Sequence, residues 1–326
     1  MNPGAPQVFA LGATEPFGRG VAGALGVELA PAEARDFDDG EHKLRPLVSV
    51  RDRDVYIVHA LDGDAEQSVN DKLCRLLFFA ATVRDHGAAR VTFVCPYLAY
   101  ARKDRRTKAR DPVTTRYVAQ MIEAAGIGRV VVLEAHNPAA VDNAFRIPLE
   151  RVHARGPLGD AILARVGDAP LAVVSPDTGG AKRAARLREA LAARTQREVA
   201  TAFLDKRRSA GVVSGDTVAG EVDGRAAVIV DDLVATGTTL RRAVAACRDR
   251  GATAVLAAAT HAVFAPGAED LLSDPALDAL LVTDSVAPRM RAQWNDRLER
   301  VSVQPLLAAV IRALHEGGSV TRVLGD

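Results

Sequence analysis

Residues 228–239 read Val-Ile-Val-Asp-Asp-Leu-Val-Ala-Thr-Gly-Thr-Thr, an apolar run followed by two adjacent carboxylates and a small, hydroxyl-rich turn. The apolar run predicts a buried parallel strand, and the residues after the turn open an amphipathic helix with Leu240, Val244 and Cys247 on its inner face. In open α/β sheets, ligands bind outside the carboxyl ends of the strands, where a helix N-terminus offers backbone donors and a favourable dipole to phosphate. The stretch therefore predicts an α/β fold with an anion site at this turn.

The side chains of this turn suit the two halves of a sugar phosphate. Gly237 lets the backbone approach the anion closely, and the threonine hydroxyls add donors. Asp231 and Asp232 only accept hydrogen bonds when ionised, so they suit vicinal sugar hydroxyls or hydrated Mg2+ better than phosphate. The alternative interpretation is a strand that ends in a capped helix beside two solvated carboxylates. The residues expected to bind the sugar phosphate are Asp231, Asp232, Thr236, Gly237, Thr238 and Thr239.

Length and composition limit the class of protein. A chain of 326 residues favours two domains of about 150 residues each. Its 42 basic and 41 acidic residues give a formal charge of +1, which offers no general attraction to nucleic acid or to a membrane. No apolar run approaches the roughly 18 residues of a membrane span, and the first basic residue is Arg19, so we expect a cytoplasmic protein. Cys74, Cys95 and Cys247 lack zinc-site spacing and are expected to be reduced core residues.

Short apolar runs alternate with helical patterns along the chain. Ser68 and Asp71 predict a capping box at the start of one helix. Asp111, Pro112 and Gly126 bracket another helix as cap, first-turn proline and terminating glycine. Alternating strands and helices imply parallel sheets that are covered on both faces. The runs expected as strands are 54–60, 90–96, 129–134, 171–175, 226–230, 254–259 and 280–283.

Four further segments and His136 resemble the ribose-phosphate diphosphokinases, also called phosphoribosyl-pyrophosphate synthases, in order and spacing. The stretch 228–239 resembles the phosphoribosyl-pyrophosphate binding loop of the type I phosphoribosyltransferase fold. The match covers nearly the whole chain. The four segments are Phe-Asp-Asp-Gly-Glu at 37–41, Pro-Tyr-Leu-Ala-Tyr-Ala-Arg-Lys-Asp-Arg-Arg at 96–106, Ser-Pro-Asp-Thr-Gly-Gly-Ala-Lys-Arg at 175–183 and Asp-Lys-Arg-Arg at 205–208.

The alternating pattern occurs twice, with Pro148, Gly156 and Pro157 interrupting it in the middle. The resemblance implies two tandem type I phosphoribosyltransferase-like domains, each with a mostly parallel sheet flanked by helices. We expect the first domain at residues 1–152, with the ATP-binding and subunit-contact segments. We expect the second at residues 153–326, with the ribose-phosphate loop and a flexible catalytic loop.

The resemblance also implies a reaction. A Mg2+-dependent transferase of nucleotide biosynthesis would move the β,γ-diphosphoryl group of ATP to the 1-hydroxyl of ribose 5-phosphate, giving phosphoribosyl pyrophosphate and AMP. Such a transfer asks for positioning and charge neutralisation rather than a covalent intermediate. By resemblance, Lys206 and Arg208 are the catalytic cations of a mobile loop that extends to Gly220 and closes over the transferred group. Outside this context, a Lys-Arg-Arg run is usually a solvated face.

Two segments are expected to bind ATP. The guanidinium of Arg102 can form bidentate hydrogen bonds to ATP phosphates, whereas Lys103 beside it would act as a point charge. By resemblance, Phe37, Asp39 and Glu41 form the adenine-recognising segment, which a neighbouring subunit supplies. The expected partners are therefore ATP, ribose 5-phosphate and further copies of the chain. The homo-oligomer would be a dimer or larger, up to a hexamer, without a nucleic acid or membrane partner.

His136 and Asp177 match the residues that hold the Mg-nucleotide in the family. His136 follows an apolar run and so lies at a strand's carboxyl end, where a lone histidine is more often a hydrogen-bonded core residue than a ligand. Mg2+ prefers oxygen ligands and keeps several waters, so we expect few protein atoms to contact it.

Three departures from the family pattern keep alternatives open. Lys103 stands where family members commonly carry glutamine, and Ala235 replaces an aspartate of many synthases. The residues after His136 lack the polar sequence of the site for phosphate activation and ADP inhibition. The alternatives are a diphosphokinase with another acceptor or donor, a non-catalytic regulatory paralogue, and a phosphoribosyltransferase that consumes the product. The chain has no Gly-Lys dipeptide and hence no Walker-type nucleotide site.

Overall fold

The computed structural model describes residues 4–209, 212–287 and 297–325. The chain forms two compact units. From the sequence we expected all of residues 153–326 in a second domain, whereas the closing residues of the chain pack with the first unit. Unit 1 holds Met1–His153, Ser285–Ala287 and Val303–Asp326, and unit 2 holds Ala154–Asp284 and Pro288–Ser302.

Unit 1 is built on a five-stranded sheet in which neighbouring strands are parallel, in the order β1-β4-β5-β6-β7. The three inner strands are almost entirely buried and mostly apolar, as expected for a sheet covered on both faces. The strands are β1 (Gln7–Ala10), β4 (Asp54–Val58), β5 (Arg90–Cys95), β6 (Arg129–Leu133) and β7 (Leu149–Val152).

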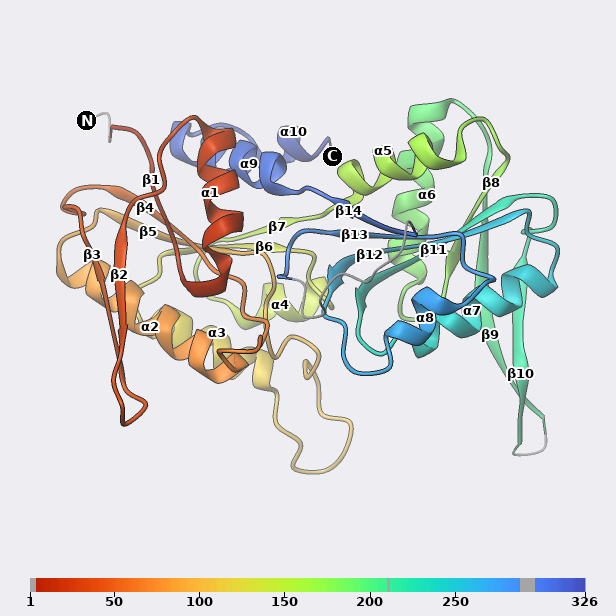
Figure 1. Ribbon diagram of the computed structural model, residues 1–326, viewed down its shortest axis with the longest axis horizontal. Helices are drawn as coiled ribbons and strands as arrows, with labels where there is room; N and C mark the ends of the chain where they lie inside the picture. The colour runs from red at the N-terminus through yellow and green to blue at the C-terminus, as the bar shows by residue number, and fades with distance from the viewer. Residues whose placement is uncertain (1–3, 210–211, 288–296, 326) are drawn as a thin grey trace. The chain divides into compact units, whose positions relative to one another are not determined.

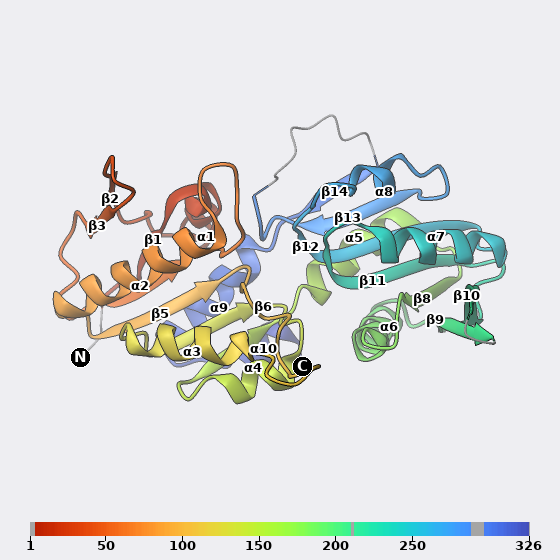
Figure 2. The ribbon, with the colours of Figure 1, turned by 90° about the horizontal axis from the view of Figure 1, so that it is seen from below.

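Helices cover both faces of this sheet (Figures 1 and 2). One face carries α1 (Glu15–Leu25) and α9 (Gln304–Glu316), with α10 (Val320–Leu324) beside α9. The other face carries α2 (Val69–Asp85), α3 (Thr114–Ala124) and α4 (Pro138–Ala144). A short 3-10 turn, η1 (Gly12–Thr14), links β1 to α1.

The helix α9 is fastened to elements from the start of the chain. The guanidinium of Arg312 donates to two carbonyl oxygens at the end of α1, at 3.1 and 3.3 Å. His315 Nδ1 lies 2.7 Å from Asp54, a carboxylate that is only 1% exposed and also accepts two hydrogen bonds from Arg90. Unit 1 is therefore completed by residues from the end of the sequence.

A two-stranded hairpin, β2 (Ala32–Asp36) and β3 (His42–Pro46), leans on α2. An ion pair joins Asp36 to Arg75, and the ring of His42 stacks on Phe78 with 5.4 Å between the ring centres. The tip of the hairpin, residues 37–41, is exposed.

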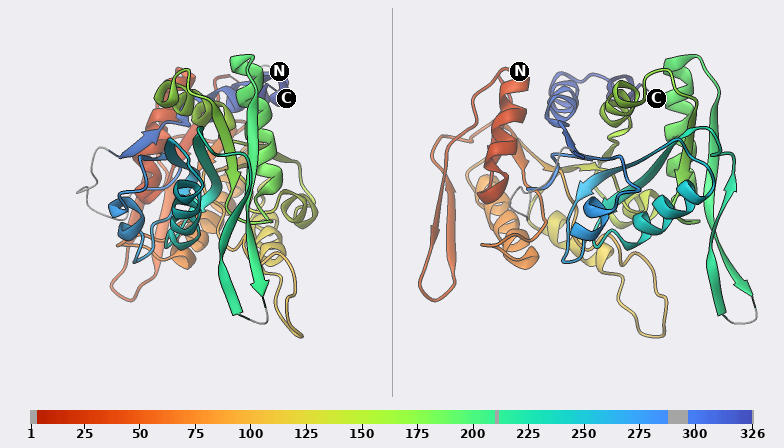
Figure 3. Two further views of the ribbon diagram at one scale, coloured as in Figure 1. Left: turned by 90° about the vertical axis from the view of Figure 1, so that its right-hand side faces the viewer. Right: turned by 45° about the vertical axis from the view of Figure 1, so that its right-hand side comes forward.

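Unit 2 is built on a seven-stranded sheet in the order β10-β9-β8-β11-β12-β13-β14, in which only β10 pairs antiparallel among the described strands. Figure 3 shows α5 (Arg155–Val166) and α6 (Ala181–Thr195) on one face and α7 (Thr238–Asp249) and α8 (Glu269–Ser273) on the other. The strands are β8 (Leu171–Ser175), β9 (Val199–Ser209), β10 (Val212–Gly220), β11 (Ala226–Val234), β12 (Ala254–Ala262), β13 (Ala279–Thr283) and β14 (Leu298–Val301).

Both units confirm the predicted α/β class with mostly parallel sheets flanked by helices. The capping box of Ser68 and Asp71 is present at the start of α2. The predicted cap at Asp111 is wrong, because α3 begins at Thr114 without a side-chain cap.

From the sequence we expected all three cysteines to be reduced core residues, and this holds for two of their positions. Cys95 and Cys247 lie in the core, whereas Cys74 is half-buried, and all three are free thiols. In the described ranges, no helix combines the length and the apolar character needed to cross a bilayer.

Candidate active site

The carboxylate pair and the hydroxyl-rich turn lie at the carboxyl end of β11 in unit 2. Gly237 has a φ of 74°, and a Cβ there would meet the Leu271 side chain at 2.9 Å, so backbone and packing both require glycine. The helix α7 begins directly afterwards without a side-chain cap, which leaves its first N–H groups for a ligand. The exposed hydroxyls beside them belong to Thr236, Thr238 and Thr239.

Asp177 lies at the same edge of this sheet. It follows β8, which pairs in parallel with β11, so the carboxyl ends of the two strands adjoin. Its carbonyl oxygen accepts a bond from Ser175 Oγ at 2.6 Å, and its Oδ1 accepts the N–H of Gly180 at 2.9 Å. The first bond holds the backbone of Asp177, and the second holds its carboxylate, in the turn that leads into α6.

Arg183, in the first turn of α6, contacts both carboxylates of β11. One guanidinium nitrogen lies 3.2 Å from Asp231 Oδ1 and the other lies 3.5 Å from Asp232 Oδ1. The Asp232 N–H also donates to Asp231 Oδ1, at 2.9 Å. We call these three residues the open cluster, because the side chains of Arg183 and Asp231 are 20% and 22% exposed. No role for Arg183 was predicted from the sequence, although it closes the recognised segment 175–183.

The open cluster shifts the titration of one of its carboxyls. Burial, followed by the neighbouring Asp232 carboxylate, raises the pKa of Asp231 to about 7. The positive charge of Arg183 acts in the opposite direction and favours the ionised form. Near neutral pH, Asp231 is therefore only partly ionised.

The predicted catalytic residues Lys206 and Arg208 lie on β9, with backbone partners Asp216 and Val213 on β10. Beyond Phe203, β9 pairs with β10 and no longer with β8, so the two strands continue as a separate hairpin. We expected a mobile loop through residue 220, whereas the described backbone there forms two strands. Residues 210–211 of that loop lie outside the described residues.

Phe37, Asp39 and Glu41 share the exposed tip of the β2–β3 hairpin in unit 1. The Phe37 ring is 40% exposed, and the guanidinium carbon of Arg35 lies 5.1 Å from its centre. The N–H of Phe37 donates to the Glu41 carbonyl at 2.9 Å, and Asp39 Oδ1 accepts the Glu41 N–H at 3.1 Å. The tip presents an aromatic ring beside acidic acceptors, a combination that suits adenine.

Asp111 holds the basic loop of unit 1 together. Its Oδ2 lies 2.5 Å from Lys103 Nζ and accepts the N–H groups of Thr107 and Lys108. These bonds, that of Lys103 first, hold the pKa of Asp111 well below its usual range. Lys103 is thus engaged within the loop, whereas Arg102 is exposed.

His136 follows β6 at the carboxyl edge of the unit 1 sheet and is exposed. The next residue, Asn137, caps α4 and donates from its amide to Asp104 in the basic loop, so the two segments are tied together. His136 belongs to unit 1 and Asp177 to unit 2. Within the described part of the chain, no three His, Cys, Asp or Glu side chains gather as a metal site.

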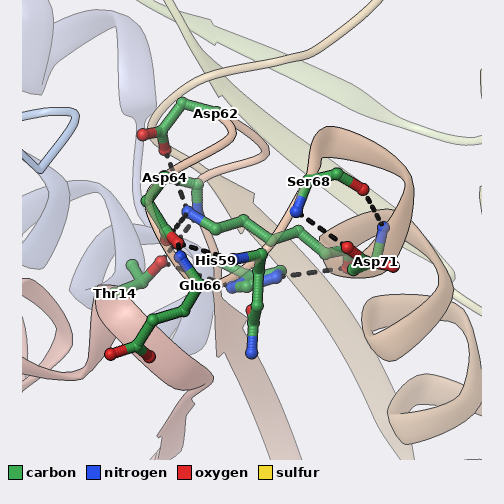
Figure 4. Close-up of polar contacts among 10 residues, drawn as sticks. Thr14, His59, Asp62, Asp64, Glu66, Ser68 and Asp71 are labelled. Atoms are coloured by element: carbon green, nitrogen blue, oxygen red, sulfur yellow. Dashed lines mark hydrogen bonds and ion pairs between the residues drawn. The ribbon is translucent and has the colours of Figure 1, made fainter. Parts of the chain in front are cut away.

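A second cluster of two aspartates and one cation was not predicted from the sequence (Figure 4). Lys72 Nζ, on α2, lies 2.8 Å from Asp64 and 3.5 Å from Asp62, in the segment after β4. We call these three residues the closed cluster, because Lys72 and Asp62 are 1% and 2% exposed. His59 Nε2 donates to the Lys72 carbonyl at 3.2 Å, and Thr14 Oγ1 lies 3.3 Å from the other ring nitrogen. Burial lowers the pKa of His59 to about 3.

Comparison with known proteins identifies the family. Residues 6–126 match the N-terminal domain of ribose phosphate pyrophosphokinase, and residues 180–324 match the phosphoribosyl synthetase-associated domain. The chain is 33% identical over 317 residues to ribose-phosphate pyrophosphokinase 1 of Listeria innocua, which covers 97% of this chain and 96% of that protein. The chain belongs to the ribose-phosphate pyrophosphokinase family. It is also 36% identical over 310 residues to a ribose-phosphate pyrophosphokinase of Caldanaerobacter subterraneus, with 93% and 92% of the two chains covered.

A solved structure extends this family assignment to the fold. The crystal structure of phosphoribosylpyrophosphate synthetase from Mycobacterium smegmatis matches with a TM-score of 0.86 and 31% identity, over 96% of this chain and 99% of that one. The predicted tandem phosphoribosyltransferase-like fold and the predicted synthase function are confirmed at the level of the ribose-phosphate pyrophosphokinase family. Like its relatives, the chain is an enzyme, and none of the alternatives is favoured by these similarities.

Proposed function

We propose that the chain transfers the β,γ-diphosphoryl group of ATP to the 1-hydroxyl of ribose 5-phosphate and gives phosphoribosyl pyrophosphate and AMP for nucleotide biosynthesis. The observation that carries this proposal is the end of β11, where two acceptor carboxylates stand next to the uncapped start of α7. The carboxylates suit the ribose diol, and the helix start suits the 5-phosphate.

In this proposal the turn after β11 divides its contacts between the two ends of the sugar. Asp231 and Asp232 accept hydrogen bonds from the 2- and 3-hydroxyls. The 5-phosphate is held by backbone N–H groups and by the hydroxyls beside them, from Thr236, Gly237, Thr238 and Thr239. The sugar is thereby oriented with its 1-hydroxyl free to react.

The transfer proceeds without a covalent enzyme intermediate. The sugar 1-oxygen attacks the β-phosphorus of ATP, the bond from that phosphorus to the α,β-bridging oxygen breaks, and AMP leaves with the electron pair. The hydroxyl proton passes to solvent. Lys206 and Arg208 neutralise the charge of the diphosphoryl group during transfer, which is the main help that such chemistry needs.

ATP is held by two segments of unit 1. Arg102 is exposed and needs no rearrangement to reach a phosphate, whereas Lys103 has first to leave Asp111. The exposed hairpin tip serves a neighbouring subunit, so the enzyme acts as a homo-oligomer of at least two chains, in the cytoplasm with its substrates. The tip residues assigned to adenine are Phe37, Asp39 and Glu41.

The donor set fits Mg2+ bound together with a nucleotide. Asp177 keeps one carboxylate oxygen beyond the one that accepts the Gly180 N–H, and His136 adds an exposed imidazole. Mg2+ commonly binds through one or two protein groups plus substrate phosphates and waters. We therefore assign His136 and Asp177 to the Mg-nucleotide. When bound, the ion would neutralise phosphate charge.

Phosphorus NMR of the purified protein with ATP, Mg2+ and ribose 5-phosphate tests the proposed reaction. We expect AMP and phosphoribosyl pyrophosphate to appear together. Lys206→Ala should lower the rate by about a thousandfold or more while ATP affinity stays within about threefold, because the cation acts mainly in the transition state. Arg207→Ala is the matched control and should keep most of the activity.

Two results would overturn these assignments. Intact ATP with the wild-type protein would reject the reaction, and the same sample with other sugar phosphates and nucleotides would then separate an altered substrate from a regulatory paralogue. A large loss of ATP affinity in Lys206→Ala with little loss of turnover would reject the catalytic role of that residue.

A further inference from the structure

The contact of Arg183 with the sugar-binding carboxylates goes beyond the roles proposed above. Two of its guanidinium nitrogens, Nη1 and Nη2, reach one oxygen of each aspartate, at 3.2 and 3.5 Å. The side chains of Arg183, Asp231 and Asp232 are 20%, 22% and 6% exposed, so solvent screens these contacts only in part. A planar guanidinium holds two acceptors in a fixed relation, which a lysine ammonium does not.

Two adjacent carboxylates have to stay ionised and correctly oriented if each is to accept a hydrogen bond from a sugar hydroxyl. Burial and mutual repulsion work against this, since they favour a proton on one of the pair. The pKa of Asp231 is raised by burial and by Asp232 even with Arg183 in place. A cation that touches both carboxylates reduces it.

We propose that Arg183 is a positioning residue for the ribose diol, which keeps Asp231 and Asp232 together as two ionised acceptors. This inference rests on the proposed binding of ribose 5-phosphate at β11. Arg183 acts through the aspartates, and it sets the affinity for the sugar phosphate rather than the rate of diphosphoryl transfer.

Few titratable or charged groups surround Asp231. Its own strand supplies Asp232, α6 supplies Arg183, and the turn after β8 places Asp177 at the same edge. On the other side, β12 pairs Ala259 with Asp231, and the next titratable side chain of that strand is the buried His261. The first turn of α7 brings threonines and no charge before Arg241. Arg183 is the cation with a direct contact to Asp231 among the described residues.

The test compares Arg183→Gln and Arg183→Lys with the wild-type enzyme by steady-state kinetics between pH 6 and 9. In Arg183→Gln we expect the KM for ribose 5-phosphate to rise about tenfold or more at pH 7, the scale of a lost charge-assisted hydrogen bond. The KM for ATP and kcat should change less than about threefold. The excess in KM should shrink towards pH 9, where Asp231 ionises without help. Arg183→Lys should restore part of the affinity.

A control on the same helix separates this role from a general charge effect. Arg186→Gln removes an exposed arginine from α6 and should leave the KM for ribose 5-phosphate unchanged. A second probe is 2-deoxyribose 5-phosphate, which lacks one hydroxyl of the diol. The effect of Arg183→Gln should be smaller with this sugar, because one of the two oriented acceptors has no donor to meet.

A merely structural role would give a different pattern. If Arg183→Gln raised both KM values alike, lowered kcat without changing the sugar KM, or acted independently of pH, the proposal would be overturned. A urea midpoint below that of the wild type would show that Arg183→Gln is destabilised. The kinetics of Arg183→Lys would then decide in its place. If the wild-type protein made no phosphoribosyl pyrophosphate, calorimetric titration with ribose 5-phosphate at pH 7 and 9 would decide instead. Equal binding by wild type and Arg183→Gln would then reject the role of Arg183.

Discussion

The open and the closed cluster contain the same set of charges at corresponding places, yet they differ in burial. Each has two aspartates in or shortly after the carboxyl-terminal part of a parallel strand, and one cation on a nearby helix. The cation of the closed cluster, Lys72, is 1% exposed, whereas Arg183 in the open cluster is 20% exposed. The buried ion pairs of the closed cluster hold a loop to a helix, while the partly exposed pair of the open cluster keeps acceptor atoms within reach of a ligand. The two clusters therefore differ in burial rather than in charge. The closed cluster is structural, and the open cluster lies at the proposed binding site.

The largest expected effect on stability is in the closed cluster. Lys72→Met should lower the free energy of unfolding by about 3–5 kcal/mol, because it leaves two carboxylates without their buried cation. Arg183→Met should lower it by about 1 kcal/mol or less, since water can still reach Asp231, which is 22% exposed. Urea unfolding followed by circular dichroism measures both.

A compensating variant tests whether uncompensated buried charge causes the loss of stability in Lys72→Met. Combining Lys72→Met with Asp62→Asn and Asp64→Asn removes the uncompensated charge and should recover much of the lost stability. Equal losses for Lys72→Met and Arg183→Met would break the distinction between the two clusters.

A smaller effect concerns the pH dependence of folding near the closed cluster. The pKa of His59 is about 3 in the folded protein, below its ordinary value of 6.5, so only the unfolded chain binds the proton in between. Stability should therefore fall as the pH drops below about 6.5, by about 1.4 kcal/mol per pH unit down to the folded pKa. Unfolding free energies at pH 7, 6 and 5 measure this slope. His59→Gln should flatten it, and an unchanged slope would assign the acid sensitivity to other groups.

The smallest expected effect lies in the basic loop, whose lysine is more exposed than the cation of either cluster. Lys103 and Asp111 are 34% and 22% exposed, so solvent screens their attraction and Lys103→Gln should change the stability less than the other variants do. The KM for ATP should change less than about fivefold if the ammonium stays with Asp111. Asp111→Asn releases Lys103 and serves as the comparison. A rise in the ATP KM above about tenfold in Lys103→Gln would show that the ammonium binds phosphate.

The sequence predicted the features that depend on local pattern. Unbroken apolar runs identified the central strands, although β11 continues beyond its predicted end at Val230 to Val234. Glycine at 237 indicated a turn, and the structure shows both the left-handed backbone and the close side chain that require it. These features are determined within a few residues along the chain.

The missed features depend on which distant elements become neighbours. Arg183 reaches the aspartates because β8 and β11 are adjacent, an order that no local pattern states. Lys72 follows a capping box and reads as a surface residue until the segment after β4 covers it. Asp111 has the sequence context of a helix cap, but the donors of its own loop compete for the carboxylate. Residues 212–220 were expected to be mobile, and they gain cross-strand partners on β9.

The attachment of α9 to α1 sets an order of events during synthesis. The ribosome makes the unit 1 sheet first, but the helix that covers one of its faces emerges only after the whole of unit 2. At about 5–20 residues per second, that delay lasts roughly ten seconds or more. In α9, Leu307, Val310 and Ile311 are fully buried, so their apolar partners face solvent or a chaperone during the wait. A premature stop just before α9 would therefore damage the unit that is made first.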